Sequence, residues 1–218
     1  MANILDTYHT IDEPAYGEYK EKGSKFLAFA YPMDEEESMQ EYLNIARAEH
    51  HKARHFCYAY QIGLSGDRYR INDDGEPSGT AGKPILGQIL SFGLTNVAII
   101  VIRYFGGTKL GVSGLIQAYR EAAKAALETA HIVEKYISSV YRLQFNYDQM
   151  GHVLNVLKDL NTDILNKSFD TSCEVTISVR QSVETHTLHQ LIARLLNKSM
   201  EEVSTETCVD FCTIEKIG

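Results

Sequence analysis

The sequence has no run of about 20 apolar residues, the length that a membrane-spanning helix needs. Its first ten residues contain no basic segment followed by an apolar core, so we expect no signal peptide and a cytoplasmic location. None of the four cysteines belongs to a Cys-x-x-Cys pair, and such cysteines are typical of reduced, mostly buried thiols. They are Cys57, Cys173, Cys208 and Cys212.

Motifs that mark several enzyme classes are also missing. A phosphate-binding loop ends in Gly-Lys followed by Ser or Thr, but here Pro84 follows Lys83, and the fingerprint Gly-x-Gly-x-x-Gly does not occur. The nucleophile elbow Gly-x-Ser-x-Gly and the zinc motif His-Glu-x-x-His are absent as well. His51 and His55 supply fewer ligands than a metal ion needs. We therefore expect no catalytic residue, no metal and no cofactor.

The charge of the chain is unevenly distributed. The net charge of −8 argues against unspecific binding of nucleic acid by the whole surface. Residues 43–124, however, carry a net charge of +4, whereas residues 1–42 carry −7 and residues 125–218 carry −5. The basic excess therefore lies in the middle of the chain.

Two glycine-rich stretches, residues 71–84 and 103–114, lie within this basic region. The apolar run from Val97 to Ile102 separates them and predicts a strand buried on both faces. Each glycine-rich stretch leads into a segment with helical periodicity. Because a helix N-terminus presents free N–H groups and a partial positive charge, we expect a site for phosphate or carboxylate here.

A backbone nest with arginine and lysine nearby can hold a phosphate oxygen. The alternative is that the glycines only permit tight turns and close packing. The candidate anion or nucleic-acid site consists of basic residues, histidines and glycines of this region: His51, Arg54, His55, Lys83, Arg103, Gly106, Gly107 and Lys109.

The acidic residues of the first glycine-rich stretch allow two interpretations. They could act as a general base or as magnesium ligands. Acids in such a sequence also form turns through hydrogen bonds from the backbone to their side chains, and we favour this reading. The candidate ligand loop consists of Asp73, Asp74, Glu76, Ser78 and Thr80.

The pattern of the chain changes near residue 134. Tyr141, Leu143 and Phe145 alternate with polar residues, which predicts a strand, and the later segments complete the order βαββαβ. This order is typical of a ferredoxin-like domain. We therefore predict an α+β protein with two domains, residues 1–134 and residues 135–218. The second domain lacks a glycine-rich loop, and we interpret it as a packing or docking module.

Residues 53–55, 72–84 and 103–111 closely resemble the signature of the YigZ/IMPACT family, and the resemblance covers residues 15–130. It implies an Impact N-terminal domain similar to the fourth domain of elongation factor G, with a left-handed βαβ crossover against the usual rule. It also implies a ferredoxin-like second domain similar to the fifth domain of that factor. Nucleic acid, the ribosome or a protein of the translation machinery is the implied partner.

We accordingly expect a non-enzymatic, cytoplasmic regulator of translation that binds RNA or the ribosome. We do not expect it to bind a membrane. One alternative is an enzyme acting on a phosphorylated small molecule or nucleotide at the glycine-rich loops. Another is a protein-docking module, for which the aromatic strand around Tyr58 and Tyr60 would present exposed surface.

Overall fold

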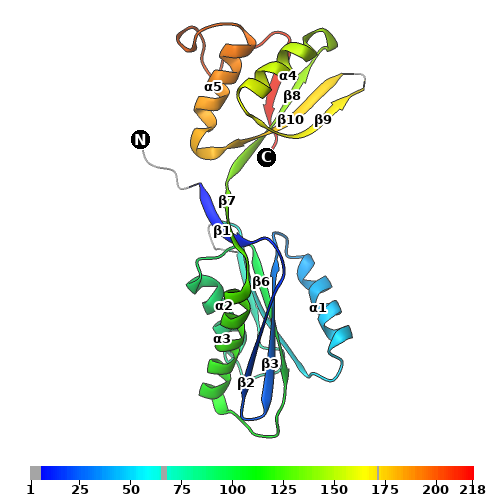
Figure 1. The fold of residues 1–218 in the computed structure, drawn as a ribbon, viewed down its shortest axis with the longest axis vertical. Coiled ribbons are helices and arrows are strands. Elements are labelled where there is room, and N and C mark those ends of the chain that lie inside the picture. Colours follow the sequence, from blue (N-terminus) through cyan, green and yellow to red (C-terminus); the bar gives the residue numbers. More distant parts are fainter. Residues whose placement is uncertain (1–5, 65–67, 171) are drawn as a thin grey trace. The chain divides into compact units, whose positions relative to one another are not determined.

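The computed structural model describes residues 6–64, 68–170 and 172–218, and the chain forms two compact units (Figure 1). The larger unit contains residues 8–135. The smaller unit contains residues 136–218, and Asp6 and Thr7 group with it rather than with the domain of residues 1–134 that the sequence predicts. In the described ranges, no helix has both the length and the apolar character needed to cross a membrane.

A five-stranded sheet in the order β2–β3–β6–β4–β5 forms the centre of the larger unit. Each neighbouring pair of strands is antiparallel. The predicted apolar strand is the central β6, and its residues 97–102 are fully buried, as expected for a strand covered on both faces. The strands are β2 (Ala15–Glu21), β3 (Ser24–Pro32), β4 (His55–Ile62), β5 (Arg68–Asn72) and β6 (Val97–Tyr104).

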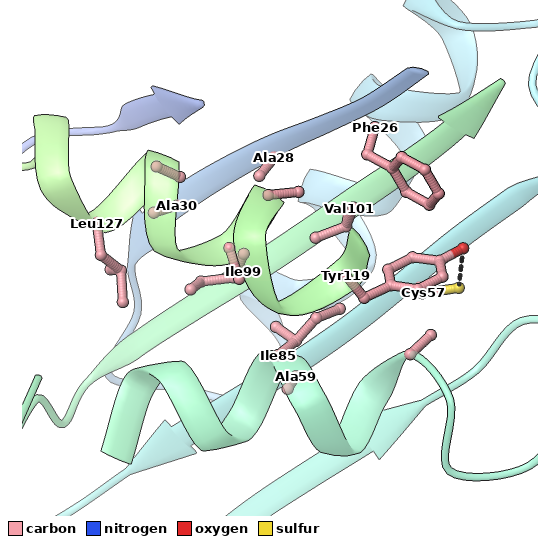
Figure 2. Close-up of a cluster of buried hydrophobic side chains, with 14 of the residues drawn as sticks. Phe26, Ala28, Ala30, Cys57, Ala59, Ile85, Ile99, Val101, Tyr119 and Leu127 are labelled. Atoms are coloured by element: carbon pink, nitrogen blue, oxygen red, sulfur yellow. Dashed lines mark hydrogen bonds between the residues drawn. The ribbon is translucent and has the colours of Figure 1, made fainter. Parts of the chain in front are cut away.

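Helices cover both faces of this sheet, α1 (Ser38–Glu49) on one face and α2 (Gly82–Ser91) and α3 (Gly111–Thr129) on the other (Figure 1). Alternate residues of β6 point to opposite faces. Ile99 and Val101 therefore pack with α2 and α3 (Figure 2), whereas Ile100 and Ile102 pack with α1. The short strands β1 (Thr7–Ile11) and β7 (Ile132–Tyr136) form a separate two-stranded sheet.

Two crossovers in this sheet each join parallel strands across one intervening strand. α1 joins β3 to β4 across β6, and α2 joins β5 to β6 across β4. The two crossovers differ in three ways: the strands β3 and β4 run opposite to β5 and β6, the crossovers move across the sheet in opposite directions, and their helices cover opposite faces. Reversing any one of these three features inverts the hand of a crossover. Because all three are reversed, the two crossovers have opposite hands. One crossover must be left-handed, which confirms the predicted exception to the right-handed rule.

The smaller unit has the predicted order βαββαβ. Its sheet has the order β11–β8–β10–β9, in which all neighbours are antiparallel, as in a ferredoxin-like fold. Leu143, Val175 and Ile177 of the sheet form its core with Leu157 and Leu191 of the helices. The elements are β8 (Ser138–Phe145), α4 (Met150–Asp159), β9 (Asp163–Phe169), β10 (Cys173–Arg180), α5 (Glu184–Leu195) and β11 (Cys212–Lys216), with 3₁₀ helices at Tyr147–Gln149, Gln181–Val183 and Met200–Glu202.

Asp6 attaches the beginning of the described chain to the smaller unit. Asp6 is buried, with 2% of its surface exposed. Its carboxylate accepts hydrogen bonds from Nε and Nη2 of Arg180 at 2.7 and 2.8 Å and from the Ser182 N–H at 2.9 Å. The guanidinium of Arg180 also lies 3.9 Å from the centre of the Tyr136 ring. These bonds, above all those from Arg180, hold the pKa of the Asp6 carboxyl well below its usual range. The smaller unit is therefore completed by a residue from the other end of the chain.

The four cysteines are free, and all except Cys208 are buried. Burial raises the pKa of the Cys212 thiol to about 11 and raises that of the Cys57 thiol further. These two buried thiols are consequently protonated at neutral pH and are poor nucleophiles.

Candidate functional site

Four connections meet at one end of the larger sheet, which we call the loop end. They are the β2–β3 turn (residues 22–23), the α1–β4 loop (50–54), the β5–α2 loop (73–81) and the β6–α3 loop (105–110). The register fixes this arrangement, because Arg103 at the end of β6 pairs with Phe26 of β3 and with His55 of β4. Both predicted glycine-rich stretches therefore reach the same surface.

The first glycine-rich stretch encloses an anion that belongs to the protein itself. Oδ1 of Asp73 accepts hydrogen bonds from the N–H groups of Ala81 and Gly82, both at 2.9 Å, and Oδ2 accepts one from Gly79 at 2.8 Å. Because these N–H groups form the start of α2, the Asp73 carboxylate occupies the position that an external phosphate would take. The turn interpretation is favoured for Asp73.

The neighbouring Asp74 also binds a backbone N–H group. Its carboxylate accepts a hydrogen bond from the Phe56 N–H at 2.7 Å, and its carbonyl oxygen lies 2.9 Å from Nδ1 of His55. Arg47 approaches the same carboxylate at 3.8 Å. Asp74 itself has a positive φ of 40°, which aspartate tolerates better than most residues. The loop is thus fastened to the start of β4.

Glu76 enters a buried polar chain. Its Oε1 accepts hydrogen bonds from Nη1 of Arg103 at 2.6 Å and from the Tyr119 hydroxyl at 2.8 Å. The Cys57 thiol lies 3.3 Å from that hydroxyl, the contact dashed in Figure 2. The Glu76 and Arg103 side chains are 5% and 7% exposed. Burial, with Cys57 and Glu76 close by, raises the pKa of the Tyr119 hydroxyl far above its usual range, so it remains a hydrogen-bond donor.

These contacts revise the role of Arg103. The sequence places it among the surface cations, but in the structure it is a core residue whose charge is matched by Glu76. The three acids of the candidate ligand loop, Asp73, Asp74 and Glu76, all have protein partners. Thr80 is buried and donates to the Pro77 carbonyl at 2.6 Å, whereas Ser78 is exposed. Across the described ranges, no group of three or more His, Cys, Asp and Glu residues could hold a metal ion.

Gly106, in the second glycine-rich stretch, is required for close packing. A Cβ atom there would lie 1.9 Å from the Gly23 carbonyl carbon and 2.2 Å from the Ser24 nitrogen. The Gly106 N–H also donates to Oγ of Ser24 at 3.1 Å. Gly107 differs, because its φ is +87° and an added Cβ would meet nothing within 4 Å. The packing interpretation is therefore favoured for Gly106.

This difference predicts unequal costs for two adjacent substitutions. Gly107→Ala only strains the backbone and is expected to cost about 1 kcal/mol of unfolding free energy. Gly106→Ala forces the β2–β3 turn away from the loop and is expected to cost about 3 kcal/mol. Urea denaturation of the two variants measures both costs, and equal losses would contradict the packing argument.

The start of α3 is open, unlike that of α2. Within the described chain no side chain caps it, its first turn contains no acidic residue, and Val112 and Ser113 are exposed. A hollow of about 240 Å³ beside it is lined by Ser113 and Gly114 of the helix, by Lys22 of the hairpin turn and by Glu21 of β2. The free N–H groups and the lysine favour an anion at this helix start, whereas the Glu21 carboxylate opposes one.

The loop end also carries exposed cations. Five basic side chains of the loop end are exposed, and the described residues give them no ion pair or hydrogen bond. His51 is exposed as well, whereas His55 is half-buried. The five are Lys22, Lys52, Arg54, Lys83 and Lys109. Of these, the sequence analysis missed Lys22 and Lys52, because only the topology brings the hairpin turn and the α1–β4 loop to this surface.

The sequence analysis also missed Phe105, which is 59% exposed beside the guanidinium of Arg103. Its signal in the sequence is an aromatic residue directly after a buried strand and directly before two glycines. Tyr58 and Tyr60 show the opposite behaviour. They are 7% and 2% exposed and pack in the core beneath α1, so the expected aromatic docking surface on β4 is absent.

The chain is similar to known proteins over most of its length. The family model of the Impact N-terminal domain matches residues 22–127. The IMPACT family member YvyE of Bacillus subtilis is 30% identical over 194 residues, which cover 89% of this chain and 89% of the relative. The IMPACT family member YigZ of Escherichia coli is 35% identical over 150 residues, covering 68% of this chain and 74% of the relative. A crystal structure described as that of a hypothetical protein has a TM-score of 0.69 at 27% identity and covers 90% of this chain and 96% of its own.

Proposed function

This chain belongs to the IMPACT family, and from this premise we propose that it is a non-enzymatic cytoplasmic protein of the translation machinery that binds RNA, free or within the ribosome, through the loop end. One observation carries the proposal: the three acids of the β5–α2 loop are bound by groups of the protein itself, whereas five cations of the same end are exposed and have no ion pair among the described residues. A chain with a net charge of −8 thereby presents a local basic surface.

This surface matches what an RNA backbone requires. Lysine and arginine neutralise phosphates and release counterions, which supplies most of the affinity of sequence-independent binding. The uncapped start of α3 adds backbone N–H donors that can bind a phosphate oxygen. The acidic remainder of the chain favours binding at this one end, since like charge repels RNA elsewhere.

The alternative enzyme at the glycine-rich loops receives less support. It requires Asp73, Asp74 or Glu76 to hold magnesium, yet Asp73 caps α2 and Glu76 neutralises Arg103. A ligand that used these carboxylates would have to break the bonds that shape the loop. The protein-docking alternative has lost the exposed tyrosines on which it depended.

The proposal predicts salt-dependent RNA binding that two substitutions weaken. We expect the double variant Arg54→Ala/Lys109→Ala to bind a short single-stranded RNA more weakly than the wild type. With four phosphate contacts, from Lys22, Lys52, Arg54 and Lys109, the slope of log K against log salt is about −2.8 on single-stranded RNA, and the variant loses about 1.4 of it. Fluorescence anisotropy over a salt series measures both quantities.

The matched control is Lys158→Ala/Lys167→Ala, which removes two exposed lysines from the smaller unit. Equal losses in the two double variants would contradict a site at the loop end. A wild type that does not bind RNA even at low salt would overturn the proposal and favour a small-molecule or protein partner.

A further inference from the structure

We propose that the loop end recognises single-stranded RNA, by stacking an unpaired base on the ring of Phe105. This inference rests on the proposed function and adds to it the form of RNA that is bound. It starts from an exposed aromatic ring among unpaired cations, which is the combination that single-strand binding proteins use.

The position of Phe105 distinguishes it from an ordinary surface residue. The preceding strand β6 is buried from Val97 to Arg103, whereas Phe105 is 59% exposed two residues later. Gly106 and Gly107 follow it and carry no side chain that could cover the ring. The chain therefore presents a large apolar ring at the point where it leaves the core.

Fixed residues support the ring. The guanidinium carbon of Arg103 lies over the Phe105 ring at 5.6 Å, within the range of a cation–π contact. Glu76 binds that guanidinium at 2.6 Å. The residue after Phe105, Gly106, is held in place by its close contact with Gly23. A base that stacks on a ring already held in place costs less conformational entropy than one that must order a flexible side chain.

The surroundings favour RNA as the ligand of this ring. Lys109 and the open start of α3 follow Phe105 within the same β6–α3 segment, so a nucleotide stacked there has phosphate contacts available nearby. A duplex hides the faces of its bases, whereas an unpaired strand exposes them. The pairing of one aromatic ring with several cations thus favours single-stranded over double-stranded RNA.

The central strands of the smaller unit's sheet offer no comparable platform, and its exposed rings Tyr136, Tyr147 and Phe169 lie outside these two strands. Ferredoxin-like domains of the RNA-recognition type stack bases on aromatic residues of the two central strands. In this chain the central strands are β8 and β10, and the residues that alternate with their core positions are polar or aliphatic. They are Ser138, Val140, Arg142, Gln144, Glu174, Thr176, Ser178 and Arg180. Arg142 there lies 3.6 Å from Glu174 and 3.9 Å from Glu215, so the sheet presents acids to a strand of RNA.

The absence of tryptophan from this chain makes the inference directly testable. Phe105→Trp places a single tryptophan at the proposed stacking position. We expect oligo(U) to quench its fluorescence, and a blunt RNA duplex of the same length to leave it nearly unchanged. Tyr69→Trp is the matched control, because Tyr69 on β5 is 57% exposed, and we expect no quenching there.

Phe105→Ala supplies the affinity measurement. Because loss of one base–aromatic stack costs a factor of about 5 to 150 in affinity, we expect oligo(U) to bind that much more weakly and the duplex to bind as before. Tyr69→Ala is expected to change neither affinity, and circular dichroism checks that each variant is folded.

Separate outcomes decide the two proposals. Unchanged oligo(U) affinity in Phe105→Ala, with binding still weakened by Arg54→Ala/Lys109→Ala, would overturn base stacking and leave RNA binding at the loop end standing; the exposed ring would then be assigned to a protein contact. Equal weakening of oligo(U) and duplex binding by Phe105→Ala would also overturn the single-strand preference. Absence of binding to either RNA would overturn both proposals.

Discussion

Replacing Glu76 by alanine is expected to lower the free energy of unfolding by about 3–5 kcal/mol. The substitution leaves the guanidinium of Arg103, 7% exposed, without the carboxylate that lies 2.6 Å from it. It also removes the acceptor of the Tyr119 hydroxyl in the same buried chain. A buried charge without a partner costs more than the pair contributes, because the desolvation penalty remains when the attraction is lost.

Urea denaturation followed by circular dichroism measures this loss. Glu128→Ala is the control, since it removes an exposed ion pair with Lys124 at i,i+4 and should cost about 0.3–0.5 kcal/mol. Glu76→Gln keeps the shape of the side chain and is expected to lose less than Glu76→Ala. If the alanine variants of Glu76 and Glu128 lost the same stability, the buried ion pair would not stabilise the fold in the way we describe.

Replacing Asp6 by asparagine is expected to destabilise the smaller unit, so that its backbone amides exchange hydrogen with solvent faster. The change removes the charge that binds Nε and Nη2 of Arg180. Hydrogen exchange followed by mass spectrometry should show faster exchange in peptides from residues 136–218, with little change in residues 8–135. Asp12→Asn is the control, because Asp12 is exposed and bonds only to His131 among the described residues.

The same pair predicts a dependence on pH. The folded state lowers the pKa of Asp6, so it binds a proton less readily than the unfolded chain does. The stabilisation is therefore complete above the unfolded carboxyl pKa of about 4 and is lost as pH falls towards the lower folded value. The stability difference between wild type and Asp6→Asn should be largest near neutral pH and shrink below about pH 4. A difference that stays constant down to about pH 2 would refute this assignment.

Local patterns were sufficient to predict much of the fold. The apolar run from Val97 to Ile102 is the buried central strand, and the alternation around Leu143 lies in β8 of the predicted βαββαβ unit. These features depend on neighbours within a few residues, which periodicity reports directly. The left-handed crossover was different: only the family resemblance suggested it, because no local pattern encodes the hand of a connection.

The contacts of the site depended on partners that lie far apart in the sequence. Arg103 is basic and follows an apolar run, which fits a surface position equally well until Glu76 is known to face it from 27 residues away. Asp73 could have held a metal, but its partners are backbone N–H groups, which carry no mark in a sequence. Lys22 and Phe105 join the site only because the β2–β3 turn and the β6–α3 loop meet at one end of the sheet.

The attachment of Asp6 to Arg180 has a consequence for how the protein is made. Asp6 leaves the ribosome before its partner Arg180, which lies 174 residues further along the chain. At a synthesis rate of about 5–20 residues per second, this separation corresponds to a wait of about 9–35 s. The larger unit, residues 8–135, has all of its own residues available before then. Synthesis therefore allows the larger unit to fold first, while the smaller unit can close on Asp6 only after Arg180 has been made.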